Sequence, residues 1–184
     1  HVKYQGKKMY LEDPVGREIF KEQLRALIDL RNMGYENIRF MFPMVEDVHD
    51  LDQIRQAILE VLDELEFVNL KEFPVGLGIM IETAKALENF NFFLSQDWLD
   101  FFSIGTNDLI AEMYDIQRDD VNANEYYKDV LPRIVYEIAR VAQGAAAADK
   151  KVKVCGELAS KRQFWIVRRI LSEMGITFGL SMPA

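Results

Sequence analysis

The chain has little of several residue types, and each shortage excludes a class of protein. It has one cysteine among 184 residues, so it cannot form an internal disulfide, which suits a reducing compartment such as the cytoplasm. No apolar run approaches the roughly 20 residues of a membrane span, and no signal peptide is recognisable. The net charge of −8 lacks the basic excess that a nucleic-acid surface needs. We therefore expect a cytoplasmic globular protein with no nucleic-acid or membrane partner.

Histidine is almost as scarce as cysteine. His1 is terminal, and His49 stands among acidic residues in a predicted helix, where a solvated helix face explains it best. The chain therefore offers no persuasive histidine nucleophile or general base. Because the first residue is His1 and not Met, we expect a processed or excised piece, or a missing start.

Short apolar runs alternate with amphipathic stretches along the chain, which predicts buried parallel strands separated by helices. No hairpin signal, repeat or linker interrupts them, so residues 1–184 should be a single α/β domain. Several Phe and Met side chains are expected in its core: Phe40, Met41, Phe42, Phe101 and Phe102. We expect strands at 38–44, 75–82, 100–104, 151–155 and 177–181, and helices at 14–34, 48–65, 83–94, 107–114, 126–148 and 160–174.

An open doubly wound sheet and a (β/α)₈ barrel both fit this alternation. A barrel has eight strands in about 250 residues, so a barrel interpretation makes this chain a partial TIM barrel with five strands, numbers 4 to 8. The first and last strands would then be apolar sheet edges that must be covered. We therefore expect the isolated chain to self-associate, for example as a dimer.

Reactive side chains follow three of the predicted strands. Glu82 and Asp108 come after two of them, and Cys155 ends a third. The carboxyl ends of parallel strands share one side of a sheet, so these groups should form one polar cluster. The two carboxylates could share Mg²⁺, which often takes one or two carboxylates plus ligand oxygens. Alternatively, Glu82 caps the following helix and Asp108 begins a helical turn.

The other candidate residues also have two interpretations each. Cys155 is either an inert buried thiol or a proton donor or nucleophile at a strand end. Gly156 with Glu157 forms either a simple turn or a backbone contact to an anionic substrate, with the carboxylate orienting the thiol. Arg118 lies in a polar loop, where it would either hold a phosphate bidentately or pair with a neighbouring aspartate.

Phe101 to Leu109, with the sequence Phe-Phe-Ser-Ile-Gly-Thr-Asn-Asp-Leu, closely resembles the signature of phosphoenolpyruvate-utilising enzymes. That family includes enzyme I of the bacterial sugar phosphotransferase system, phosphoenolpyruvate synthase and pyruvate phosphate dikinase. Residues 38–44, 78–82 and 155–159 and Arg118 are similar to the same family in the expected order. The likeness extends over nearly the whole chain.

The resemblance implies a barrel that binds phosphoenolpyruvate and Mg²⁺ and passes the phosphoryl group to a histidine on a separate phosphocarrier domain. The parent would be a phosphoenolpyruvate-dependent phosphotransferase, whereas the isolated chain is expected to be inactive. Cys155 would exchange a proton with the pyruvate methyl carbon, which assumes a thiol pKa near neutrality. By the same resemblance Glu82 and Asp108 would be the metal ligands, and Asn107 and Arg118 would hold the phosphoryl group.

The chain departs from the family pattern at three places. Glu82-Thr83-Ala84 lacks the proline that usually follows the metal glutamate, and Ile110-Ala111 replaces a Thr-Gln pair. The family's other phosphate-binding arginines lie on strands that precede this segment. Residues 155–159 favour enzyme I, whereas residues 31–34 slightly favour the synthase or dikinase, so we rank enzyme I first. An alternative of another class is a non-catalytic barrel remnant that binds a ligand or mediates dimer contacts.

Overall fold

A single parallel sheet forms the centre of the molecule. The computed structural model describes residues 10–66, 70, 73–115 and 123–181. All neighbouring strands are parallel, and their spatial order follows the chain. A doubly wound sheet reverses its strand order at a switch point, whereas a barrel does not, so the order favours the partial barrel. In that order the strands are β1 (Arg39–Phe42), β2 (Gly76–Ile81), β3 (Phe101–Gly105), β4 (Lys151–Cys155) and β5 (Gly179–Ser181).

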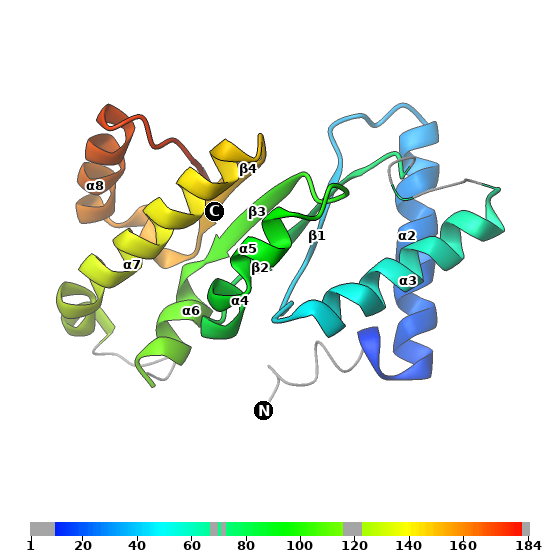
Figure 1. Cartoon of the computed structure of the whole chain (residues 1–184), viewed down its shortest axis with the longest axis horizontal. Coiled ribbons are helices and arrows are strands. Elements are labelled where there is room, and N and C mark those ends of the chain that lie inside the picture. The colour runs from blue at the N-terminus through cyan, green and yellow to red at the C-terminus, as the bar shows by residue number, and fades with distance from the viewer. Residues whose placement is uncertain (1–9, 67–69, 71–72, 116–122, 182–184) are drawn as a thin grey trace.

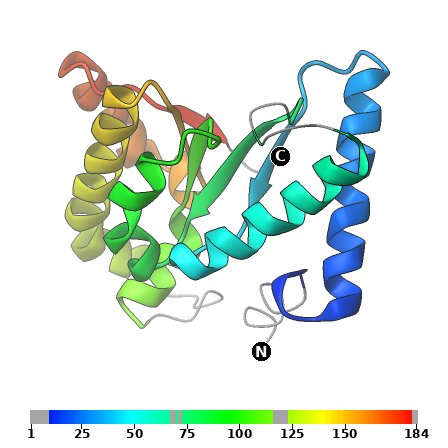
Figure 2. The same ribbon diagram turned by 45° about the vertical axis from the view of Figure 1, so that its right-hand side comes forward.

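Helices separate the strands, as the alternation predicts. Figure 1 shows α2 and α3 side by side at one end of the sheet and α7 and α8 toward the other. In the turned view of Figure 2 the strands lie between these two groups. Among the described residues, no helix has both the length and the apolarity needed to cross a membrane. The helices are α2 (Pro14–Asn32), α3 (Val48–Glu64), α4 (Ala84–Glu88), α5 (Phe90–Leu94), α6 (Thr106–Met113), α7 (Ala123–Ala147) and α8 (Arg162–Glu173), with a 3₁₀ turn, η2 (Glu157–Ser160).

Local sequence signals fix the ends of the first helix and the first strand. Asp13 caps α2 by accepting a hydrogen bond from the Gly16 backbone N–H at 2.7 Å. Gly34, with φ +95°, follows the helix in the left-handed conformation that ends many helices. Strand β1 ends at Phe42, directly before Pro43, because proline has no N–H to continue the ladder. These boundaries match the sequence prediction.

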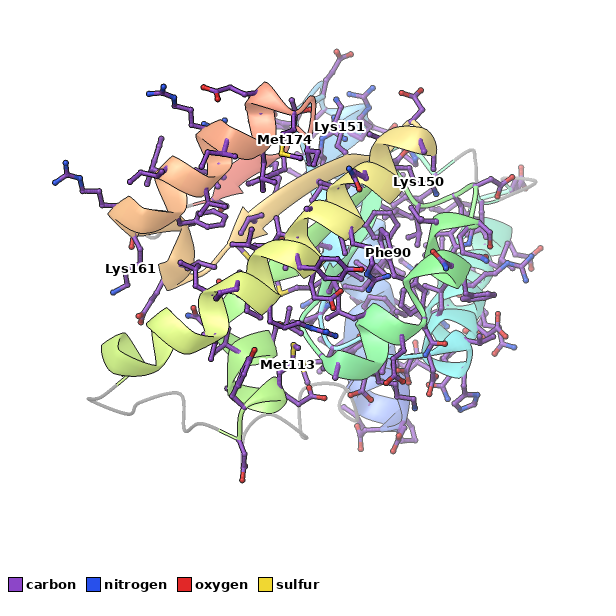
Figure 3. All side chains as sticks on the ribbon, turned by 60° about the vertical axis from the view of Figure 1, so that its left-hand side comes forward. Phe90, Met113, Lys150, Lys151, Lys161 and Met174 are labelled. Carbon is purple, nitrogen blue, oxygen red and sulfur yellow. The ribbon has the colours of Figure 1, made fainter. Side chains whose placement is uncertain are left out.

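Aromatic packing joins the sheet to its helices. Phe102 on β3 is fully buried and lies against Phe90 of α5 in an edge-on contact, with 5.1 Å between ring centroids. Figure 3 labels Phe90, which also lies below the Arg140 guanidinium of α7. Gly78 on β2 faces Phe101, whose backbone and ring would lie 2.6 Å from an added Cβ. Glycine at position 78 therefore leaves the space that the Phe101 ring and carbonyl occupy next to β2.

Two expectations about the elements need correction. The single helix expected at 83–94 is two short helices, α4 and α5, because Asn89 ends the first and precedes the second. The Asn89 side chain donates a hydrogen bond to the backbone carbonyl of Glu46, just before α3, at 2.9 Å. The predicted core is also less complete at the sheet edge. Phe42, Phe101 and Phe102 are buried, whereas Phe40 and Met41 are only half-buried on the edge strand β1.

Candidate active site

The polar groups predicted from the sequence meet at the carboxyl ends of β1 to β4. Glu82 directly follows β2, and Asp108 lies in the first turn of α6 after β3. Cys155 is the last residue of β4 and pairs in register with Gly105 at the end of β3. The sheet therefore brings two carboxylates and a thiol to one edge, as the strand-end pattern predicts.

Glu82 is buried, with only 4% of the residue exposed, and a hydrogen bond orients its carboxylate. Its Oε1 accepts a hydrogen bond from the backbone N–H of Met44 at 2.7 Å. Its Oε2 is turned toward the end of β3, where a Cβ added to Gly105 would lie 3.1 Å away. One carboxylate oxygen thus faces β1, and the other faces β3.

The helix-capping interpretation of Glu82 is wrong. The N-cap of α4 is Thr83, whose hydroxyl accepts a hydrogen bond from the Ala86 backbone N–H at 3.1 Å. Asp108 does occupy the first turn of a helix, as the alternative interpretation proposed. That position does not oppose a role in ligand binding, because the first turn of α6 also points toward the strand ends. The Asp108 Oδ1 atom is buried.

A second group of contacts joins the ends of β3 and β4. The Asn107 side-chain oxygen accepts a hydrogen bond from the Glu157 backbone N–H at 2.8 Å. The Thr106 hydroxyl donates to the Cys155 carbonyl, also at 2.8 Å. Gly156 has φ +103°, and an added Cβ would lie 2.5 Å from the Thr106 hydroxyl and 2.7 Å from the Asn107 oxygen. Both the backbone angle and the crowding require glycine here.

The Cys155 thiol is half-buried beside β3. Its sulfur donates to the Ile104 carbonyl at 3.3 Å and accepts from the Ser103 hydroxyl at 3.5 Å. Burial raises the pKa of the thiol, and the negative charges of Glu82 and Asp108 raise the pKa further, whereas the Ser103 hydrogen bond lowers it. The expectation of a thiol pKa near neutrality is therefore wrong for the protein without ligand. At neutral pH this thiol keeps its proton.

Not every predicted site residue falls in the described part of the chain. Arg118 lies outside the described residues, so its phosphate-binding role stays a prediction. His49 is exposed on α3 and lies 3.1 Å from the Gln53 side chain, which agrees with a solvated helix face. The sequence did not single out Ser103, Thr106 or Met44. Ser103 and Thr106 lie inside the family signature at Phe101 to Leu109, which could have identified them. No local sequence signal marks Met44.

The donor set suits a hard divalent cation. Within the described ranges no group of three or more His, Cys, Asp and Glu side chains could hold a metal ion. Two carboxylates at neighbouring strand ends match Mg²⁺, which usually completes its octahedron with water and substrate oxygens. Gly105 leaves room beside Glu82 Oε2 that a side chain would fill. The residues present therefore fit a cation that needs the substrate to complete its coordination.

A match to a protein-family model over nearly the whole chain identifies the family. A family model described as PEP-utilising enzyme, PEP-binding domain, where PEP is phosphoenolpyruvate, matches residues 4–184. The chain belongs to this family. The phosphoenolpyruvate-protein phosphotransferase of Mycoplasma genitalium is 38% identical over 170 residues, covering 90% of this chain and 27% of that protein. The Bacillus subtilis protein of the same name is 32% identical over 157 residues, covering 85% and 26%.

A third relative carries a different name. Multiphosphoryl transfer protein 1 of Escherichia coli is 31% identical over 150 residues, which cover 79% of this chain and 17% of that protein. The chain spans about a quarter of the length of the phosphoenolpyruvate-protein phosphotransferases that it matches. The family assignment therefore describes this segment of the PEP-utilising enzymes.

Solved structures support the partial barrel. A malate synthase from Haloferax volcanii, in its magnesium and glyoxylate complex, superposes with a TM-score of 0.64 at 15% identity. The match covers 94% of this chain and 49% of that one. A citrate lyase from Burkholderia xenovorans has a TM-score of 0.56 at 18% identity, covering 79% and 45%. These neighbours confirm a TIM-barrel-like fold, and the matched region covers about half of each neighbour's chain.

Proposed function

We propose that the chain is the phosphoenolpyruvate- and Mg²⁺-binding part of a cytoplasmic phosphotransferase similar to enzyme I. The parent would move the phosphoryl group of phosphoenolpyruvate to a histidine on a phosphocarrier domain or protein. The observation that carries the proposal is the convergence of Glu82, Asp108, Asn107 and Cys155 at the ends of neighbouring strands. The names of the relatives favour enzyme I over phosphoenolpyruvate synthase or pyruvate phosphate dikinase.

Each residue has a role that its surroundings suit. Glu82 and Asp108 would hold Mg²⁺, which supplies charge neutralisation for the phosphoryl group. Asn107 and the backbone at Gly156 would contact phosphoryl oxygens, since the Asn107 amide group lies where α6 begins. Arg118 would add a bidentate contact to the same group.

Cys155 would act as the carbon acid. When the phosphoryl group leaves phosphoenolpyruvate, the electron pair of the P–O bond stays on the enolate oxygen. The thiol proton would then move to the methylene carbon as the C=C electrons form the new C–H bond, which gives pyruvate and a thiolate. Water would reprotonate the thiolate in a later step. A raised thiol pKa supports this role, because the acid must keep its proton until the enolate forms.

The metal assignment is tested by binding to the chain itself. Mn²⁺ is a paramagnetic probe of Mg²⁺ sites, and its binding in the presence of phosphoenolpyruvate is measured by electron paramagnetic resonance. We expect Glu82→Gln and Asp108→Asn each to weaken Mn²⁺ binding by at least about tenfold. Glu88→Gln removes an exposed carboxylate from α4 and serves as the matched control. Unchanged Mn²⁺ affinity in both site variants would contradict the assignment.

A non-catalytic barrel remnant is the second candidate. It is favoured by Ile110, which is buried in the core where the family usually has a polar residue of a Thr-Gln pair. The two candidates differ in the parent protein. An enzyme transfers phosphate from phosphoenolpyruvate to its carrier, whereas a remnant binds the ligand without turnover. Turnover assays of the full-length parent, with the phosphocarrier varied, distinguish them.

A further inference from the structure

We infer that Tyr10 is a positioning residue for Glu82, acting through the peptide unit between Pro43 and Met44. The inference rests on the proposed cation site, because it assigns a second layer to one of the two carboxylates. It also explains why a side chain before the first long helix reaches the end of β1.

The contacts form a continuous chain of hydrogen bonds. The Tyr10 hydroxyl donates to the Pro43 carbonyl oxygen at 2.6 Å. The Met44 backbone N–H donates to Glu82 Oε1 at 2.7 Å. The Pro43 carbonyl and the Met44 N–H belong to one peptide unit, which is planar and, like the other peptide bonds of the described residues, not cis. In a trans peptide the C=O and N–H point in opposite directions, so this unit connects Tyr10 on one side with Glu82 on the other.

A rigid plane transmits orientation. Rotation of the peptide about its Cα–Cα axis would move the carbonyl and the N–H together. When Tyr10 holds the carbonyl, it also fixes the direction of the N–H toward Glu82. A hydrogen bond at the carbonyl also polarises the peptide and strengthens donation by its N–H, by about 10–30%. Glu82 Oε1 would then remain engaged, which leaves Oε2 directed toward β3.

The backbone at Met44 needs such support. Met44 has φ +56°, in the left-handed region that residues other than glycine rarely adopt. Backbone strain of this kind persists only where the surroundings over-determine it, and it clusters at functional sites. The Tyr10 and Glu82 contacts lie on both sides of the strained peptide. The next turn is fixed separately, since the Glu46 N–H donates to Asp50 Oδ2 at 2.9 Å.

The Tyr10 ring is fixed independently of its hydroxyl. Its centroid lies 5.3 Å from that of Phe20, which is buried in α2. Phe20 in turn packs edge-on against Phe42, at 5.8 Å between ring centroids. Removing the hydroxyl alone would therefore keep the ring in place and release only the Pro43 carbonyl. This separation makes Tyr10→Phe a specific test.

The test combines two readouts on the intact 184-residue chain. The first is hydrogen exchange of the Met44 amide, followed by NMR, and the second is Mn²⁺ affinity in the presence of phosphoenolpyruvate. We expect Tyr10→Phe to speed Met44 amide exchange several-fold relative to core amides of β3. We expect Mn²⁺ affinity to fall several-fold, which is less than the 10–100-fold loss typical when a direct partner of a metal ligand is removed, because Tyr10 acts through the intervening peptide. Tyr35→Phe removes the hydroxyl of an exposed tyrosine and is the matched control.

The outcomes separate the inference from the proposed function. If the wild-type chain binds no Mn²⁺, the proposed function fails, while the Met44 exchange rates still test the contact chain. If the wild type binds Mn²⁺ and Tyr10→Phe binds it equally well, Tyr10 only anchors the N-terminal segment and the inference is overturned. Lower thermal stability with unchanged Mn²⁺ affinity and unchanged Met44 exchange would overturn it as well.

Discussion

The Asn107 side-chain oxygen accepts a hydrogen bond from the Glu157 backbone N–H at 2.8 Å, which joins the carboxyl ends of β3 and β4. Because the oxygen is bonded to Glu157, the amide nitrogen of Asn107 is the side-chain group that would serve a ligand. That nitrogen would face a phosphoryl group bound over the start of α6. Under the proposed function Asn107 would have two roles, one structural and one toward the ligand.

Substitution of Asn107 should separate these roles. We expect Asn107→Ala to cost about 0.5–1.5 kcal/mol of unfolding free energy, the net value of one hydrogen bond, because water can reach the exposed Glu157. We expect phosphoenolpyruvate affinity to fall by about tenfold or more, since phosphoryl contacts are charge-assisted. Urea unfolding and isothermal titration calorimetry measure the two quantities. Asn91→Ala, at an exposed position of α5, is the control, and equal affinities in both variants would contradict the ligand contact.

Gly105 should be intolerant of even a methyl group. An added Cβ would lie 2.8 Å from Glu82 Cβ and 3.0 Å from Met80 Sδ. We expect Gly105→Ala to destabilise the fold by about 1–3 kcal/mol and to displace Glu82, which would lower Mn²⁺ affinity. At Gly179 an added Cβ would meet only the flexible Lys153 side chain closely, at 3.2 Å, so Gly179→Ala is the matched strand control. Wild-type Mn²⁺ affinity in Gly105→Ala would show that Oε2 is not the ligand-facing oxygen.

Cys155 should react slowly with electrophiles at neutral pH. Burial and the nearby carboxylates raise its pKa, so iodoacetamide alkylation in the folded chain should rise at higher pH than in the urea-unfolded chain. The stability effect follows the same direction. The unfolded thiol ionises first, near pH 8.5, so its contribution to stability is lost as the pH rises above that value. Because Cys155 is the single cysteine, the signal is unambiguous, and equal midpoints in both states would contradict the shift.

The carbon-acid role of Cys155 is tested in the full-length parent. We expect Cys155→Ala to block exchange of the pyruvate methyl protons with solvent, as followed by NMR in D₂O. Phosphoryl exchange that does not require carbon protonation should survive, because the phosphoryl contacts are intact. Ser160→Ala removes an exposed hydroxyl from η2 and controls for local disturbance. Wild-type methyl exchange in Cys155→Ala would return the residue to the inert-core interpretation.

Local signals predicted the fold better than they predicted the site. The strand ends at Glu82 and Cys155 follow from apolar runs, and the parallel sheet then brings these ends together. The capping interpretation of Glu82 failed because the next residue, Thr83, is the N-cap of α4. The sequence alone did not show which of the two residues begins the helix. The Tyr10 and Met44 contacts join segments 33 and 38 residues apart, so no local pattern marks them. The break at Asn89 likewise coincides with a hydrogen bond to Glu46, a residue 43 positions away in the chain.

The thiol shows a different limit of sequence reasoning. Its strand-end position predicted that Cys155 lies near the strand-end carboxylates, which the structure confirms. The pKa, however, depends on burial and on carboxylates from two other strand ends. These charges are 47 or more residues away in the chain, and their distance to Cys155 is fixed only by the register of the sheet. A local sequence pattern therefore suggests the role of the residue and leaves its proton affinity undetermined.

The two ends of the sheet lead to the last prediction. Among the described strands, β1 pairs only with β2 and β5 pairs only with β4, so each presents an edge. Helix α8, close to the β5 end, also exposes a row of large apolar side chains at helical spacing. Ile166 is 58% exposed, and Met174, labelled in Figure 3, is 68% exposed. Exposed edges and apolar rows of this kind favour association with further protein.

We therefore expect the isolated chain to self-associate and to release no pyruvate from phosphoenolpyruvate. Light scattering coupled to size exclusion should give a mass that rises with concentration above that of the 21.4 kDa monomer. Replacing Ile166 and Ile170 together by Asn should weaken association, because the change removes apolar area from the exposed face of α8 without adding charge. Leu65→Asn, at an exposed leucine after α3, should have no effect. A stable wild-type monomer at all concentrations, or equal masses for the α8 variant and wild type, would show that these surfaces do not drive association.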